Sequence, residues 1–113
     1  MTPTWIAEEH VIFVEPDGRR NAGRIAVAQP VPIDDGDASC QVVLERDRTL
    51  TYPPMFGAST LQALLLGVQL LGYELHDFLE RGGRVLGAED GEDFPLDVLF
   101  GPLLRAPSSA SPR

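Results

Sequence analysis

The feature that most constrains the fold is a single long helical pattern running from Ser59 to Arg81. Ser59 followed three residues later by Gln62 is typical of a capping box, and Gly82-Gly83 is typical of a helix C-terminus. A helix over these 23 residues would span about 34 Å. We predict that its broad apolar stripe packs on a β-sheet.

The helix is predicted to be apolar on two sides. The broader stripe, predicted to face the sheet, holds Leu61, Leu64, Leu65, Val68, Leu71, Leu75, Phe78 and Leu79. A second group, Leu66, Leu70 and Tyr73, lies on the opposite side at i, i+4, i+7 spacing. Either the chain's own residues 94–104 cover this group, or it is a candidate interface with a second molecule. Gly67 lies nearby and would allow close approach in either case.

The remainder of the chain shows strand and turn patterns. We predict strands at Trp5–Glu15, Arg20–Val31, Cys40–Arg46 and Thr49–Tyr52, with Pro16-Asp17-Gly18 as the first turn. Phe94–Phe100 alternates but contains Pro95, which indicates an edge strand or an extended strap.

Together these patterns predict an α+β fold. It consists of an antiparallel β-meander of about four strands packed on one long α-helix (59–81), with a C-terminal extended strand or strap. With 113 residues the chain fits one domain, predicted over 1–104. Residues 105–113 are rich in Pro, Ser and Ala, and we expect a disordered tail there.

Charge and hydropathy exclude several classes of partner. The 17 acidic residues outnumber the 9 basic ones, for a net charge of −8, so the chain has little to offer to nucleic-acid phosphates. The longest apolar run, Ala63 to Val68, is far shorter than the roughly 20 residues that span a bilayer. The N-terminal residues lack the basic head and apolar run of a signal peptide. We therefore expect a cytoplasmic protein that binds neither nucleic acid nor membrane.

The residues that could lead nucleophilic or transition-metal chemistry are His10, His76 and Cys40. They fall on three different predicted elements and lack the spacing of metal ligands. Cys40 fits a small apolar strand residue, and His76 a residue at the edge of the helix stripe. We therefore predict no catalytic residue, no metal site and no cofactor.

Two acidic turns are candidate contact loops for a cationic partner. Their carboxylates are Asp34, Asp35, Asp37, Glu89, Asp90, Glu92 and Asp93. The first turn lacks the alternate ligand positions and the twelfth-position glutamate of an EF-hand, so a solvated turn is favoured over a calcium site. The two turns would form one anionic rim if the fold brought them together.

Several segments resemble a family of small bacterial domains of unknown function. They are Gly23-Arg24, Pro30-Val31-Pro32, Asp35-Gly36-Asp37, Cys40-Gln41-Val42 and the helix start from Gly57 to Leu64. The resemblance covers Ile6 to Leu79 and leaves out Gly82 to Arg113. It implies a strand-turn-strand-helix unit. Because the family has no assigned activity, it implies no catalytic residue.

Two hypotheses of function follow. The first is a non-enzymatic protein-interaction module that self-associates as a homodimer, with the helix stripe and the acidic loops as contact surfaces. One form of it is an acidic immunity- or antitoxin-like inhibitor that binds a basic protein. The alternative is a small ligand-binding domain or enzyme with a pocket between sheet and helix, using Tyr73, His76 or Cys40.

Overall fold

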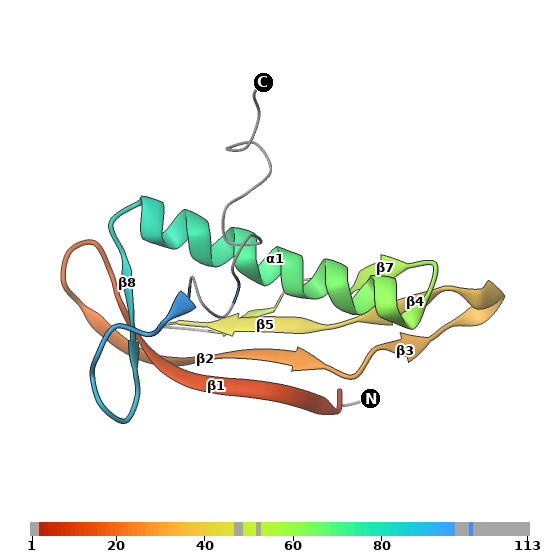
Figure 1. Ribbon diagram of the computed structural model, residues 1–113, viewed down its shortest axis with the longest axis horizontal. Helices are drawn as coiled ribbons and strands as arrows, with labels where there is room; N and C mark the ends of the chain where they lie inside the picture. Colours follow the sequence, from red (N-terminus) through yellow and green to blue (C-terminus); the bar gives the residue numbers. More distant parts are fainter. Residues whose placement is uncertain (1–2, 47–48, 52, 97–99, 101–113) are drawn as a thin grey trace, which may run out of the picture.

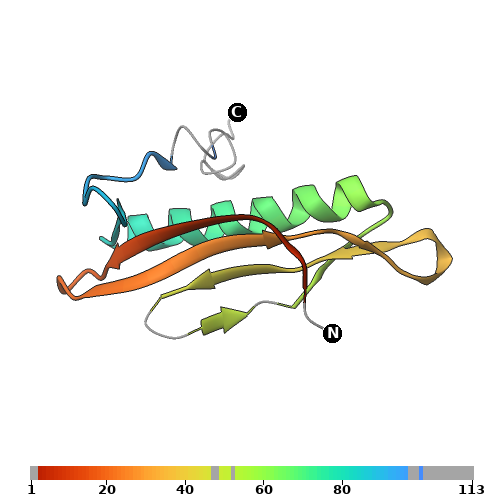
Figure 2. The same cartoon turned by 90° about the horizontal axis from the view of Figure 1, so that it is seen from below.

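The computed structural model describes residues 3–46, 49–51, 53–96 and 100. Its strands are β1 (Trp5–Val14), β2 (Arg20–Ala28), β3 (Val31–Pro32), β4 (Ala38–Cys40), β5 (Val42–Glu45), β6 (Thr49–Thr51), β7 (Met55–Gly57) and β8 (Arg84–Gly87). A short 3-10 turn, η1 (Asp34–Gly36), and one long helix, α1 (Thr60–Glu80), complete the described elements. Figures 1 and 2 show α1 lying along one side of the strands. The predicted α+β fold of antiparallel strands on one long helix is confirmed.

The main sheet has the strand order β6-β5-β2-β1-β8, with every neighbouring pair antiparallel. The first hairpin turns at Asp17 and Gly18, as predicted, because Gly18 adopts a φ of +92° that a side chain would strain. The Asp17 carboxylate accepts a hydrogen bond from the Arg19 backbone N–H at 3.0 Å, and that bond lowers the pKa of Asp17. Strand β8, which pairs with β1 at the sheet edge, was not predicted.

A smaller sheet, in the order β3-β4-β7, continues the β2–β5 hairpin beyond the main sheet. The Ala28 backbone N–H donates to the Gln41 carbonyl at 2.9 Å, so the hairpin stays paired where the two sheets meet. The inward side chains here are small. Ala38 and Cys40 form a second buried cluster with Ala63 of the helix.

The face that α1 buries differs from the prediction in its N-terminal half. The buried residues are Ala63, Gly67, Leu71, Gly72, Leu75 and Phe78. Leu61 and Leu65, predicted to face the sheet, are 64% and 54% exposed, so for these two the prediction is wrong. The cause is close packing, because a Cβ on Gly67 would lie 2.9 Å from Val42 Cγ1. The helix therefore turns its smallest residues, not its largest, toward the small sheet.

The main core lies under the C-terminal half of α1. It joins β1, β2, β5 and β8 to the helix through Val11, Phe13, Ile25, Val42, Leu44, Leu71, Leu75, Phe78, Val85, Leu96 and Phe100. The rings of Phe13 and Phe78 meet edge to face with their centroids 5.6 Å apart. This core fixes the end of the helix next to β8.

The segment after β8 covers part of the main core. The Phe94 backbone N–H donates to the Val85 carbonyl at 2.8 Å, and Asp93 forms a single bridge with Leu86. Leu96 and Phe100 are buried in the core, but both are helical rather than extended. Residues 97–99 and the predicted tail, 105–113, lie outside the described residues.

The contrast between buried and exposed leucines on one helix yields the first prediction. Leu75 is fully buried, so Leu75→Ala should lower the free energy of unfolding by about 2–5 kcal/mol. The matched control Leu61→Ala, on the exposed side, should change it by about 0.5 kcal/mol or less. Urea unfolding of dilute protein, followed by circular dichroism, measures both. Equal losses from the two variants would show that Leu61 is part of the core.

Candidate functional site

The exposed side of α1 carries an apolar hollow over its first three turns. Its lining residues, which we call the outer helix face, are Ser59, Leu61, Gln62, Leu65, Leu66 and Gln69. The hollow has a volume of about 380 Å³. Leu61 and Leu65 are among the most exposed large apolar residues of the described chain. Both belong to one helix and lie one turn apart, so they form a continuous apolar surface.

The capping box predicted at the start of α1 is present and holds this face in place. Ser59 Oγ accepts a hydrogen bond from the Gln62 backbone N–H at 3.1 Å. Gln62 Oε1 accepts one from the Ala58 backbone N–H at 2.6 Å. Reciprocal bonds of this kind satisfy backbone donors that a helix otherwise leaves open. The first turn, and with it Leu61, therefore has a defined orientation.

The outer helix face is free of charge. Charged residues make up 23% of the chain, yet the sequence has none between Arg48 and Glu74. Depletion of charged side chains is the compositional mark of the buried centre of a protein interface. The charged residues of α1, such as Glu74, Asp77 and Glu80, are confined to its C-terminal part.

The predicted interface group is divided by the fold. Leu66 is half-buried and lines the outer helix face. Leu70 is half-buried and packs against the main core of the same chain. Tyr73 is half-buried on the neighbouring turn. Of the three, Leu66 lies in the surface that Leu61 and Leu65 dominate.

The two acidic turns lie at opposite ends of the molecule. Asp34, Asp35 and Asp37 lie at the tip between β3 and β4, whereas the turn from Glu89 to Asp93 follows β8 (Figure 1). Figure 2 shows the same separation from a second side. The carboxylates of both turns are exposed. The fold therefore does not bring the two turns together into a single anionic rim.

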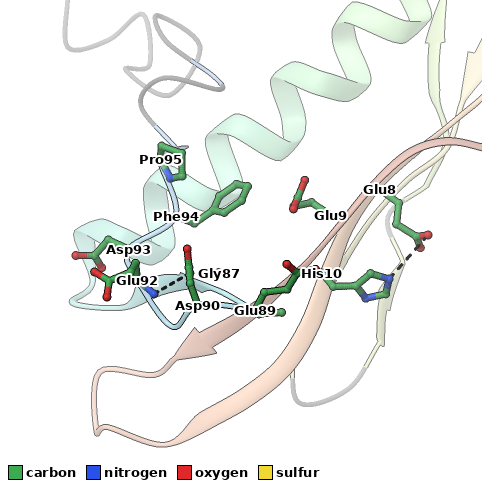
Figure 3. A pocket seen from close by; sticks show the side chains of 11 residues that line it. Glu8, Glu9, His10, Gly87, Glu89, Asp90, Glu92, Asp93, Phe94 and Pro95 are labelled. Atoms are coloured by element: carbon green, nitrogen blue, oxygen red, sulfur yellow. Dashed lines mark hydrogen bonds and ion pairs between the residues drawn. The ribbon is translucent and has the colours of Figure 1, made fainter.

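The second acidic turn instead adjoins β1. Glu8, Glu9 and His10 line one side of a hollow of about 400 Å³, and the turn with Phe94 and Pro95 lines the other (Figure 3). Sequence reasoning did not connect these segments, because the pairing of β8 with β1 joins residues far apart in the chain.

The charged side chains that line this acidic hollow have the contacts and the exposure of an ordinary solvated surface. Asp90 accepts a hydrogen bond from the Glu92 backbone N–H at 3.0 Å, and Arg84 pairs with Asp93 at 2.9 Å. The side chains of His10 and Asp93 are 69% and 72% exposed. Among the described residues, no group of three or more His, Cys, Asp or Glu is placed to hold a metal ion.

Two arginines, Arg24 and Arg46, form ion pairs and ring contacts within the chain. Arg24, on the sheet surface, donates to Glu8 at 2.7 Å and lies 3.4 Å from Glu45, with its guanidinium 5.1 Å from the centre of the Trp5 ring. The hydrogen bond to Glu8 is the main cause of a raised pKa for Arg24. These contacts fix the N-terminal end of β1 to β2 and β5.

Arg46 makes the corresponding contact on the helix side of the sheet. It lies 3.3 Å from Glu15 and 4.9 Å from the centre of the Phe78 ring. It thus closes the end of the main core.

Cys40, His10 and His76 do not meet. Cys40 is buried at the junction of the sheets, where its Sγ donates to the Ala28 carbonyl at 3.4 Å, and burial raises the pKa of its thiol. His76 is half-buried on α1, 4.0 Å from Glu80. Cys40, His76 and Tyr73 line neither the outer helix face nor the acidic hollow, whereas His10 lines the acidic hollow.

Comparison with known proteins adds no relative. No family model, curated protein or solved structure matches the chain significantly. The resemblance to a family of small bacterial domains thus stays a prediction. Within the part of the chain that the structure describes, no helix is long and apolar enough to cross a membrane.

One feature of the sequence indicates that the outer helix face is exposed, although hydrophobic periodicity alone does not take that feature into account. Ala63 and Gly67 are spaced i, i+4, which places a strip of small residues on one side of the helix. A strip of small residues allows the helix to pack closely on the sheet. That side of the helix can therefore be buried in place of the side that carries large apolar residues. Combined with the absence of charge up to Tyr73, that strip would have placed Leu61 and Leu65 outside.

The environment of Cys40 yields the second prediction. In the folded protein its thiol should react with a disulfide reagent at least about 1,000-fold more slowly than in urea-unfolded protein, because reaction requires opening of the junction between the sheets. Absorbance of the released thiolate measures both rates. Fast reaction in the absence of urea would contradict the burial of Cys40.

Proposed function

We propose that this chain is a non-enzymatic protein-interaction module that binds its partner through the outer helix face. The observation that carries the proposal is the pair Leu61 and Leu65, 64% and 54% exposed at the centre of a charge-free surface. Full burial of an exposed leucine contributes about 1.5–3 kcal/mol, so water contact at both positions is costly. A partner that covers them recovers that free energy. A cytoplasmic location is part of the same proposal.

Other exposed apolar residues support a binding surface less well. Ile6 and Ile33 lie on separate elements. Val31 and Phe56 share one row of the small sheet, but Ser39 lies between them, which separates the two by about 10 Å. A continuous apolar area is what distinguishes an interface core from scattered exposed side chains. The outer helix face meets that criterion best.

The form of the hypothesis in which the chain inhibits a basic protein receives less support. It requires acidic contact surfaces, and the two acidic turns lie at opposite ends of the fold. One basic active site could contact only one of them. The apolar surface also carries no carboxylate with which a basic protein could pair. We therefore base the proposed function on apolar docking.

Position-specific photo-cross-linking tests the third prediction. A photoreactive residue in place of Leu65 should give a discrete adduct in the cells that naturally produce the chain. Ile6 is the matched control because it is 52% exposed and lies on β1. The same label at Ile6 should give no discrete adduct. Absence of any intermolecular adduct from position 65, or equal adducts from both positions, would overturn the proposed function.

A further inference from the structure

We infer that the partner on the outer helix face is a second copy of this chain, bound antiparallel about a two-fold axis near Leu65. The inference rests on the proposed function and names its partner. In a two-fold interface the same surface patch occurs on both sides, so its groups must be compatible with one another, and only a residue at the axis meets its own copy. This requirement can be checked residue by residue on the lining of the hollow.

Each lining residue satisfies it. Leucines pack on leucines, and Leu61, Leu65 and Leu66 form the apolar centre. Primary amides carry both donors and an acceptor, so Gln62 and Gln69 can pair with whichever polar group of the copy lies opposite. Ser59 likewise has a donor and acceptors. A carboxylate or guanidinium group would be buried against this apolar patch without an opposite charge, and neither occurs in this lining.

The charge of the remaining surface favours the same partner. With a net charge of −8, two copies repel each other wherever acidic surfaces meet. The outer helix face is a place where they can meet without opposing like charges. A basic partner would gain its electrostatic attraction elsewhere, at the acidic turns. The surface is thus better suited to a copy of the chain than to a strongly cationic protein.

The distribution of charge along α1 selects the antiparallel arrangement. Glu74, Asp77 and Glu80 all lie toward its C-terminal end. Parallel helices would place these carboxylates beside their copies. An antiparallel crossing centred near Leu65 opposes the two charge-free halves and directs the acidic ends away from each other. It also opposes the two helix dipoles, which is the favourable orientation.

The fourth prediction concerns the mass of the purified chain in solution, which sedimentation equilibrium measures. Wild type should have the mass of two chains. Leu65→Glu should raise the dissociation constant at least about 100-fold, because two carboxylates would meet at the axis. Ile6→Glu, the matched control, should leave the mass unchanged. Circular dichroism confirms that each variant is folded, which is expected because Leu65 is half-exposed.

A charge-swap mixture tests the symmetry itself. Leu65→Glu and Leu65→Arg should each be monomeric alone, since each places like charges opposite each other. Mixed in equal amounts, they should form a heterodimer with one chain of each kind, detectable by native mass spectrometry. Recovery on mixing requires position 65 to face position 65 of the partner. Monomeric behaviour of the mixture, with wild type dimeric, would overturn the proposed axis.

The mass of the photo-cross-linked adduct separates failure of this inference from failure of the proposed function. An adduct at position 65 with the mass of two chains supports both. An adduct with a different protein, together with a monomeric wild-type chain, overturns the second copy but retains the interaction module. An adduct that joins position 65 to the same chain's residues 101–113 overturns both.

Discussion

The contact on which the rest of the structure depends is the close approach of α1 to the junction of the two sheets. At Gly67 the helix lies so near Val42 that a Cβ would come within 2.9 Å of Val42 Cγ1. Ala63, Ala38 and Cys40 complete a buried cluster made entirely of small residues. Because the helix is held this close, its rotation about its own axis is fixed. That rotation places Leu61 and Leu65 in water and Leu71 and Leu75 in the main core.

Local signals in the sequence predicted most of the fold. Ser59 and Gln62 cap the helix as expected, Gly82 ends it with a φ of +97°, and the turn at Gly18 forms the first hairpin. Each of these depends on neighbours in the chain, so sequence pattern suffices. The strands β7 and β8 were missed because they are three and four residues long and show no clear alternation. Their existence depends on pairing with distant strands.

The candidate site was harder to predict because burial is decided by packing between elements. Hydrophobic periodicity assumes that the largest apolar residues face the core. Above the small sheet that assumption fails, since the fully buried helix residues there are Ala63 and Gly67, and Leu64 is only partly buried. Leu66 was correctly placed away from the sheet, whereas Leu70 packs against the main core. The acidic hollow depended likewise on a long-range pairing, that of β8 with β1.

The exposure of Leu61 and Leu65 and the lack of charge around them have different causes. Close packing at Gly67 accounts for the exposure of Leu61 and Leu65, but it does not require the residues around them to be uncharged. Gln62 accepts the capping hydrogen bond from the Ala58 N–H, so helix stability accounts for glutamine there, whereas Gln69 is half-buried. In a chain with a net charge of −8, the lack of charge at Leu61, Leu65 and Gln69 is not explained by the cap. It is explained if these side chains lie against another surface, where an unpaired charge would cost several kcal/mol of desolvation.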